Sequence, residues 1–182
     1  MEPAPFPRLA TPRLVLRAPC EGDIPAWFAR ATDAEAAALA GDPVAVDITD
    51  GERWLARSHQ RFIDGTAIKW SIDREGEAIG SITLTFEEAD AQAAALGFVL
   101  ARAHWGQGLV TEAAREVVRY GFEALPLERV TAEAAMRNFA SLRVLEKLGF
   151  TEVASFVDPS DGENCKRFTL EKDMRSPPDR GS

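Results

Sequence analysis

The 182-residue sequence has few cysteines, no long apolar run and a deficit of positive charge, and each shortage excludes a class of protein. Its two cysteines, Cys20 and Cys165, stand in no metal-ligand spacing, so we expect no metal site and two free thiols in a reducing compartment, with one disulfide as the alternative. No apolar run is long enough to cross a membrane, and residues 1–7 lack the basic start and apolar run of a signal peptide. The net charge of −8 leaves little basic surface for nucleic acid or anionic lipid. We therefore predict a cytoplasmic protein that binds neither nucleic acid nor membrane.

What the sequence does have is the composition of one globular domain. Hydrophobic residues make up 46% and charged residues 27%, which are ordinary values for such a domain. The length suits a single domain with a buried core. We expect this domain over residues 8–172, with mobile ends at residues 1–7 and 173–182 because these segments are rich in proline or polar residues.

Apolar periodicity predicts a mixed α/β sheet. Alternating or continuous apolar runs indicate strands near residues 13–17, 67–73, 78–86, 96–100, 129–135, 151–157 and 166–170. Helical spacing indicates helices near residues 24–32, 34–40, 51–63, 113–122 and 138–148. Asp23 is the candidate N-cap of the first helix, and Glu75-Gly76 is a hairpin turn signal. The order of these elements favours one sheet flanked by helices.

The stretch from Arg102 to Ala113 is the strongest local signal in the chain. An apolar strand leads into Gly106-Gln107-Gly108, and an amphipathic helix follows, with Thr111 as a candidate cap. Glycines let the backbone approach a ligand closely, and the N–H groups of a helix N-terminus point at an anion. The pattern therefore favours a phosphate site. Its spacing matches neither a dinucleotide fingerprint nor a nucleoside-triphosphate loop, and a plain strand-to-helix turn is the simpler alternative.

A second motif, Asn138-Phe139-Ala140-Ser141-Leu142-Arg143-Val144-Leu145-Glu146-Lys147-Leu148-Gly149-Phe150, follows some way along the chain. Together with His104-Trp105-Gly106-Gln107-Gly108-Leu109-Val110-Thr111-Glu112-Ala113 and the opening Thr11-Pro12-Arg13-Leu14-Val15-Leu16-Arg17, it resembles the GNAT N-acetyltransferases. The nearest branch contains the ribosomal-protein alanine acetyltransferases. The resemblance covers roughly residues 8–172. It implies the GNAT fold, a mixed, mostly antiparallel sheet of about seven strands flanked by helices, whose fourth and fifth strands splay apart to hold acetyl-CoA.

The same resemblance implies which residues meet the co-substrate acetyl-CoA. Backbone amides of residues 106–111 would hold the pyrophosphate. The end of the preceding strand and the side chain of Asn138 would both contact the pantetheine arm. Ser141 would be the catalytic donor to the departing sulfur. The implied set is Phe98, Val99, Leu100, Gly106, Gln107, Gly108, Leu109, Val110, Thr111, Asn138 and Ser141. The simpler alternatives make Asn138 only an N-cap and Ser141 a surface residue. Arg143 or Lys147 would suit the 3′-phosphate, although helix charges of this kind are usually solvated.

One departure from the family pattern bears on catalysis. Relatives often carry a glutamate where this chain has Ala95, so a common candidate base is missing. Glu133 is the candidate catalytic replacement, and the acidic cluster Glu87, Glu88 and Asp90 is an alternative acting through water. That cluster is otherwise either a solvated loop tip or an attraction for a cationic amine.

The missing base favours an acceptor that loses its proton easily. A lysine-like amine has a pKa of about 10.4, whereas an α-amine titrates at about 7.7–8.0 and is partly neutral already. We expect an amine acceptor that is a protein N-terminal α-amine or a small amine, reached by direct attack because no cysteine lies in either motif. An aminoglycoside-like acceptor stays an alternative, and a non-catalytic acyl-CoA-binding or sensing domain is the rival class. Sequence leaves monomer and homodimer open.

The helical region near the start of the chain lies over the acceptor groove in GNAT proteins. By that resemblance Trp27, Trp54 and His59 are candidate groove residues. Aromatic residues at helical spacing are more often buried in a core, and we favour that interpretation here.

Overall fold

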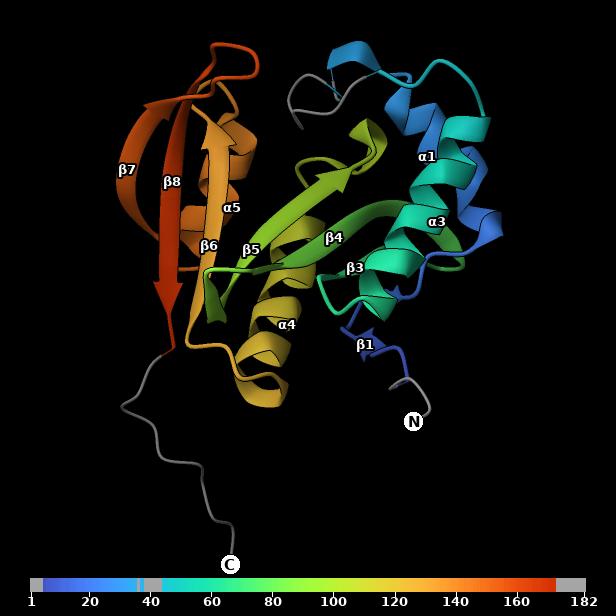
Figure 1. The fold of residues 1–182 in the computed structure, drawn as a ribbon. Helices are drawn as coiled ribbons and strands as arrows, with labels where there is room; N and C mark the ends of the chain where they lie inside the picture. The colour runs from blue at the N-terminus through green and yellow to red at the C-terminus, as the bar shows by residue number, and fades with distance from the viewer. Residues whose placement is uncertain (1–4, 36, 38–43, 173–182) are drawn as a thin grey trace, which may run out of the picture.

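The computed structural model of the chain describes residues 5–35, 37 and 44–172, and its centre is one eight-stranded sheet (Figure 1). The strand order is β1-β2-β3-β4-β5-β6-β8-β7, and every pair is antiparallel except the parallel pair of β5 and β6. The strands are β1 (Leu9–Ala10), β2 (Val15–Arg17), β3 (Ala67–Arg74), β4 (Glu77–Glu87), β5 (Asp90–Leu100), β6 (Arg129–Ala135), β7 (Thr151–Val157) and β8 (Asn164–Glu171). The helices are η1 (Glu21–Asp23), α1 (Ile24–Ala31), α3 (Thr49–Ile63), η2 (Arg102–His104), α4 (Leu109–Ala124) and α5 (Phe139–Lys147). Within the described residues, no helix is both long and apolar enough to cross a membrane.

The expected sheet is confirmed, with two differences in its strands. The two-residue strand β1 brings the number to eight. Strand β5 begins at Asp90, well before the expected start at Leu96, so Glu87, Glu88 and Asp90 lie at a tight hairpin turn. The alanine-rich segment before Leu96 has little intrinsic strand preference, and pairing with β4 decides its structure. The helix expected over residues 34–40 falls mostly outside the described residues.

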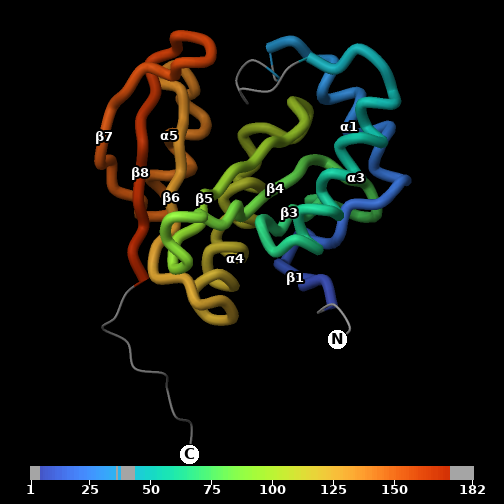
Figure 2. Tube along the Cα trace, in the orientation of Figure 1, coloured from blue at the N-terminus to red at the C-terminus, as the bar shows by residue number. Residues whose placement is uncertain are grey.

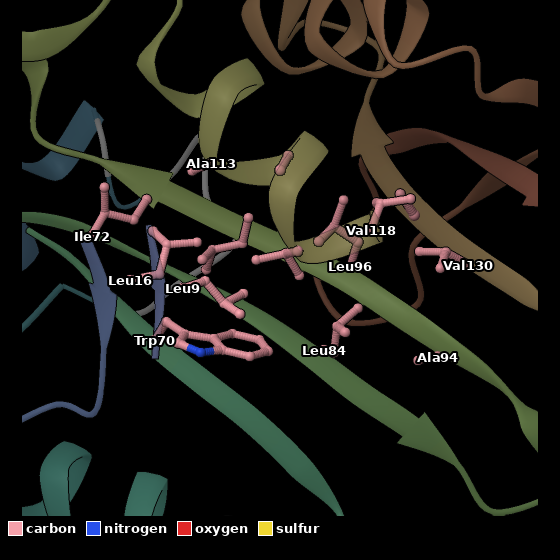
Figure 3. Packing of buried hydrophobic residues seen from close by; sticks show 14 of the residues in the cluster. Leu9, Leu16, Trp70, Ile72, Leu84, Ala94, Leu96, Ala113, Val118 and Val130 are labelled. Atoms are coloured by element: carbon pink, nitrogen blue, oxygen red, sulfur yellow. The ribbon is translucent and has the colours of Figure 1, made fainter. Parts of the chain in front are cut away.

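Two faces of the sheet follow from the alternation of side chains along β3, β4 and β5. Even-numbered residues such as Trp70, Leu84 and Leu96 are buried against α4 and form the core (Figure 3). Odd-numbered residues point to the opposite face, which α1 and α3 cover (Figure 1). Lys69, Thr83 and Gly97 are register partners on this second face.

Strands β5 and β6 part soon after they meet. Their registered pairs are Ala93 with Arg129, Ala94 with Val130, and Ala95 with Thr131. Beyond Ala95, β5 stays paired with β4 and β6 stays paired with β8, and the two strands diverge (Figures 1 and 2). The backbone edge of β5 from Leu96 to Leu100 is therefore not covered by β6. The expected splay of these two strands is confirmed.

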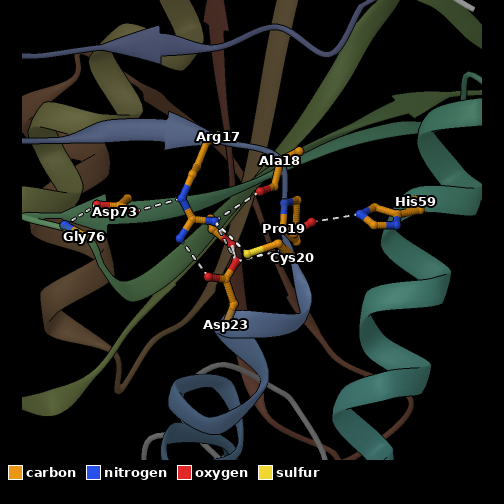
Figure 4. A network of polar contacts seen from close by, with 9 residues as sticks. Arg17, Ala18, Pro19, Cys20, Asp23, His59, Asp73 and Gly76 are labelled. Atoms are coloured by element: carbon orange, nitrogen blue, oxygen red, sulfur yellow. Dashed lines mark hydrogen bonds and ion pairs between the residues drawn. The ribbon is translucent and has the colours of Figure 1, made fainter.

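A buried ionic network holds α1 on its face of the sheet (Figure 4). Asp23, at the start of α1, accepts hydrogen bonds from the Arg17 guanidinium at 2.7 and 2.9 Å and from the Ser71 hydroxyl at 2.6 Å. Arg17 also donates to Asp73 at 2.8 Å. Burial alone would raise the pKa of Asp23, but these bonds and one from the Cys20 backbone outweigh it and leave the pKa lowered. Asp23 has the expected N-cap position, yet its side chain makes no capping bond because Arg17 and Ser71 engage it.

The start of the described chain is fixed to the domain at Phe6 and Pro7, although both residues were expected to belong to a mobile end. The Phe6 ring lies 4.9 Å from the Phe62 ring and 6.1 Å from Trp70. The Trp70 indole donates to the Pro7 carbonyl at 2.7 Å.

Candidate active site

A cavity of about 730 Å³, the larger cavity, opens where β5 and β6 part. Residues 96–100 of β5 line one wall and residues 132–135 of β6 line the other. The glycine loop and the first turns of α4 and α5 also line it. The structure thus brings together the two sequence motifs, which are far apart along the chain.

The glycine loop, Gly106 to Gly108, lies between η2 and α4. Gly106 and Gly108 have φ values of 73° and 74°, in the left-handed region that favours glycine. Helix α4 begins at Leu109 with Gly108 as its N-cap, so the first N–H groups of the helix have no intrahelical partners, and residues 108–111 line the cavity. The expectation that Thr111 caps this helix is wrong, because Thr111 lies inside the first turn and the left-handed glycine replaces a side-chain cap.

The opening Thr-Pro-Arg motif holds this loop in place. The Glu112 carboxylate accepts a hydrogen bond from the Thr11 hydroxyl at 2.6 Å and pairs with the Arg13 guanidinium at 2.6 Å. Burial alone would raise the pKa of Glu112, but these bonds outweigh it and leave the pKa lowered. Arg13 also donates to the Gln107 carbonyl at 3.0 Å. The side chain of Gln107 forms hydrogen bonds with the Arg74 guanidinium and the Ala103 carbonyl. The backbone of Gln107, and not its side chain, is therefore the part that could contact a ligand in the loop.

Asn138 and Ser141 both line the larger cavity at the start of α5. The Asn138 side chain accepts a hydrogen bond from the Ser141 backbone N–H at 3.1 Å, which makes it the N-cap of this helix. Because they are three positions apart, both side chains lie on the same face of the helix. Asn138 is therefore an N-cap, as the simpler alternative predicted. This position also leaves Asn138 in the wall of the larger cavity.

Glu133 is already engaged by a neighbouring strand. It lies on β6 in the wall of the larger cavity, and its carboxylate pairs with Arg167 of β8 at 2.7 Å. The acidic cluster that includes Glu87 and Asp90 is further away, at the opposite end of β5. Glu87 accepts from the Thr131 hydroxyl and Asp90 pairs with Arg129.

Both cysteines are free thiols, as expected. Cys20 is exposed, whereas Cys165 is buried and lines the larger cavity. Burial raises the pKa of the Cys165 thiol, and neighbouring carboxylates add to the effect. A thiol with a raised pKa is a poor nucleophile at neutral pH, so Cys165 is not placed for covalent catalysis.

A second cavity, of about 530 Å³, lies on the face of the sheet that α1 and α3 cover. Trp27 of α1 and Trp54 of α3 line it, with their ring centroids 5.7 Å apart and their planes nearly parallel. Both side chains are half-buried and lie outside the buried core, so the core interpretation of these two residues is wrong, and their role in an acceptor groove stays a prediction. His59 lies neither in the core nor in the lining of this cavity, and it is exposed. Its ring forms a hydrogen bond with the Pro19 carbonyl at 2.8 Å, which fixes α3 to the loop before α1 (Figure 4).

The two cavities meet at β5. Gly97, Phe98, Val99 and Arg30 line both of them. A Cβ atom at Gly97 would meet no protein atom within 4 Å, so the absent side chain leaves open space at the junction. At Gly80 on the neighbouring strand, a Cβ would lie 2.3 Å from the Val99 carbonyl oxygen, so this glycine permits close approach of β4 to the same part of β5.

The smaller cavity carries positive charge. Arg30, Arg57 and Lys69 line it, and the Lys69 ammonium lies 5.9 Å from the centre of the Trp54 ring. Asp50 is the one carboxylate among the described residues of its lining. The Arg53 guanidinium and two backbone N–H groups hold the pKa of Asp50 at about 2.

The sequence contains a signal for this cavity that motif reasoning missed. Helix α1 carries Trp27-Phe28-Ala29-Arg30, and helix α3 carries Trp54-Leu55-Ala56-Arg57. Residues three apart lie on one helix face, so each helix turns a tryptophan and an arginine toward the same cavity. The repeated Trp-x-x-Arg pattern on two helices is the observation that would have identified this lining.

Comparison with known proteins agrees with this architecture. The model of the Acetyltransferase (GNAT) domain family matches residues 13–151. The uncharacterized N-acetyltransferase YoaA of Bacillus subtilis is 32% identical over 147 residues, which are 80% of this chain and 83% of YoaA.

Two solved structures share the fold at low sequence identity. RimL, a ribosomal L7/L12 alpha-N-protein acetyltransferase in complex with coenzyme A, superposes with a TM-score of 0.79 at 18% identity over 90% of this chain and 96% of RimL. Spermidine N-acetyltransferase from Vibrio cholerae, in complex with CoA and spermine, gives a TM-score of 0.76 at 17% identity over 88% of this chain and 96% of that one. The expected fold is therefore confirmed, and this chain belongs to the GNAT acetyltransferase family.

Proposed function

We propose that this protein transfers the acetyl group of acetyl-CoA directly to a primary amine, with the donor in the larger cavity and the amine in the smaller one. The observation that carries the proposal is the junction at Gly97, Phe98 and Val99, where both cavities share one wall. Two substrates, one in each cavity, would meet there without an intermediate bound to the protein. Holding two reactants at such a junction supplies much of the rate by proximity alone.

The larger cavity fits acetyl-CoA in its backbone geometry. The N–H groups at the start of α4 suit the pyrophosphate, and the left-handed glycines leave room for it. The edge of β5 not covered by β6 suits the amide-rich pantetheine arm, which would pair with it as a strand does. Arg143 and Lys147 line the same cavity and suit the 3′-phosphate.

In the proposed reaction the amine nitrogen forms a bond to the thioester carbon, and the carbon–sulfur bond breaks. The nitrogen loses its proton to solvent, and the departing thiolate gains one. Ser141 is the proposed donor to the sulfur, since it lies in the larger cavity one helical turn from Asn138. A backbone N–H at the end of β5 would polarise the thioester carbonyl.

In the described part of the chain, neither Asp50 nor Glu133 suits the role of base for the amine. Asp50, with a pKa of about 2, is almost always ionised and too weak a base, and Glu133 is paired with Arg167 on the other side of β5. Without a base at these positions, the reaction suits an acceptor that is a protein N-terminal α-amine or a small amine of low pKa, because such an amine is partly neutral already.

Calorimetry with acetyl-CoA, followed by thiol release across a panel of amines, tests the proposal. Gly106→Val should abolish acetyl-CoA binding because it places a side chain in the phosphate cradle. Gly76→Val is the matched control, since Gly76 also has a positive φ and open space but lies in a distant hairpin. Equal loss in both variants would contradict the assigned cradle. Binding without turnover on any amine would favour a non-catalytic acyl-CoA-binding domain.

A further inference from the structure

We infer that Arg102 is a positioning residue of the reaction, which holds the C-terminal end of α1 against the end of β5 and so sets the spacing at the junction of the two cavities. This inference rests on the proposed function and adds a residue to it. Arg102 lies in η2, between β5 and the glycine loop. It stands just outside the motif that begins at His104.

The Arg102 guanidinium joins two carboxylates that follow α1 in the chain. It donates two hydrogen bonds to Asp33, from Nε at 2.9 Å and from Nη2 at 2.7 Å, and a third from Nη1 to Glu35 at 2.6 Å. A bidentate pair of this kind fixes orientation as well as distance. Exposed ion pairs are usually weak, and bidentate geometry within a network of several charges is the exception. The contact with Asp33 and Glu35 therefore has the geometry that orders a segment.

The same guanidinium is also fixed to β5. Arg102 lies 5.4 Å from the centre of the Trp105 ring, which is a cation–π distance. The Trp105 indole donates to the Leu100 carbonyl at 2.8 Å, so the ring is attached to the last residue of β5. A continuous set of contacts thus runs from the end of β5 through Trp105 and Arg102 to Asp33.

The end of α1 that Arg102 holds belongs to the wall of the smaller cavity. Arg30 and Ala31, at this end, line the smaller cavity, and Arg30 lines the larger one too. The Ala31 carbonyl accepts a hydrogen bond from the Ala45 N–H at 2.9 Å, so the end of α1 also supports the part of the lining that contains Ala45. Loss of Arg102 would loosen this end of α1, while the Asp23 network keeps the opposite end in place.

A shift of this wall would affect the acceptor more than acetyl-CoA. The larger cavity is lined mainly by β5, β6, the glycine loop and α5, whereas α1 contributes directly to the smaller one. A displacement of about 1 Å between two reacting groups can cost on the order of 10²-fold in rate. We therefore expect Arg102 to act on the placement of the amine beside Gly97.

Two measurements on Arg102→Gln test the inference. With alaninamide as the acceptor probe, kcat/KM for the amine should fall by about tenfold, while the Kd for acetyl-CoA stays unchanged. Hydrogen exchange reports the end of α1 without any acceptor. The amides of Thr32 and Asp33, which bond the Phe28 and Arg30 carbonyls, should exchange about tenfold faster in the variant.

Arg129→Gln is the matched control. The Arg129 guanidinium also joins two carboxylates, those of Asp90 and Glu171, and its side chain is 44% exposed against 45% for Arg102, but it lies beside the start of β5. The control should leave both measurements unchanged. Arg102→Lys keeps the charge without the bidentate geometry, so it should recover only part of the loss.

Equal exchange at the end of α1 in Arg102→Gln and Arg129→Gln would overturn the inference, whether or not alaninamide is acetylated. Full recovery of kcat/KM by Arg102→Lys would overturn it too, because the residue would then act only as a distant charge. Failure of the unmodified protein to bind acetyl-CoA would instead overturn the proposed function.

Discussion

The larger cavity takes its shape from backbone, whereas the smaller cavity takes its shape from side chains. The first is bounded by two diverging strands and a glycine loop at the start of α4. The second is bounded by tryptophan, arginine and lysine side chains that two helices and a strand direct to one place. A cavity formed by backbone suits a ligand common to many enzymes, because it depends little on the identity of side chains. A cavity formed by side chains suits a ligand particular to one enzyme.

The two cavities also have separate supports. Thr11 and Arg13 hold the glycine loop through Glu112. Arg17, Ser71 and Asp73 hold α1 through the network around Asp23 (Figure 4). Because these supports do not share a side chain, a change in one should affect the two cavities unequally.

The largest effect is expected on stability, from loss of the Asp23 carboxylate. Asp23→Asn leaves Arg17 and Ser71 with a neutral partner in a buried site and should lower the free energy of unfolding by about 3 kcal/mol. Acetyl-CoA affinity of the folded protein should change little, because the network supports α1 and the smaller cavity. Chemical denaturation and calorimetry measure the two quantities. Glu123→Gln, in an exposed ion pair on α4, is the control and should cost no more than about 0.5 kcal/mol.

The same network predicts a pH dependence of stability. Because the pKa of Asp23 is lowered in the folded state, its contribution is fully present above the unfolded pKa near 4 and is lost as pH falls through the folded value. The free energy of unfolding of the unmodified protein should therefore fall below about pH 4 more steeply than that of Asp23→Asn. Parallel curves for the two proteins would show that Asp23 is not the group responsible.

The next largest effect is expected at the junction of the cavities. Gly97→Val adds a side chain on the face of Lys69 and Thr83, at a position where a Cβ atom would meet no protein atom within 4 Å, so the protein should fold normally. The acceptor should be displaced, and kcat/KM should fall by about 10²-fold. Ala95→Val, the control, also ends in valine and adds two carbon atoms at the next position along this face, outside the lining of both cavities, so it should leave the rate unchanged. Equal rates for Gly97→Val and the control would place the acceptor elsewhere.

A smaller effect separates chemistry from binding in the larger cavity. Ser141→Ala should lower kcat by about 10²-fold or less, since a single donor to developing charge is worth about 10²–10³ and a thiolate leaves readily. The Kd for acetyl-CoA should stay the same, because backbone amides supply most of the binding. Asn138→Ala should show the reverse, with weaker acetyl-CoA binding and a loss of about 1 kcal/mol of stability from the missing cap. An unchanged single-turnover rate for Ser141→Ala would remove the serine from the mechanism.

The smallest effect is expected at Glu133. Its carboxylate is paired with Arg167, and Glu133 lines only the larger cavity and not the smaller one, so Glu133→Gln should change kcat/KM by no more than about threefold. The pH profile should then rise with one ionisation, that of the acceptor amine, in both proteins. A loss of about 10²–10⁴-fold, with a change in the profile, would identify Glu133 as the base after all.

The difference between the cavities explains what the sequence could predict. The glycines and the Asn138 motif form continuous stretches in which spacing fixes local backbone geometry, and the larger cavity follows from them. The smaller cavity depends on where α1 and α3 settle on the sheet, which the distant contacts of Asp23 and His59 decide. The early start of β5 was missed for a related reason, since its pairing with β4 overrides the weak strand preference of alanine.

A crystal structure of the protein with coenzyme A tests most directly whether donor and acceptor occupy separate cavities that meet at β5. We expect the pyrophosphate within about 2.7–3.2 Å of the backbone N–H groups of residues 106–111. The pantetheine arm should run along β5, with the sulfur near Phe98 and Val99 and facing Ser141, and the smaller cavity should stay open beside Trp27. Coenzyme A in the smaller cavity, or a sulfur distant from the Gly97 junction, would contradict the account.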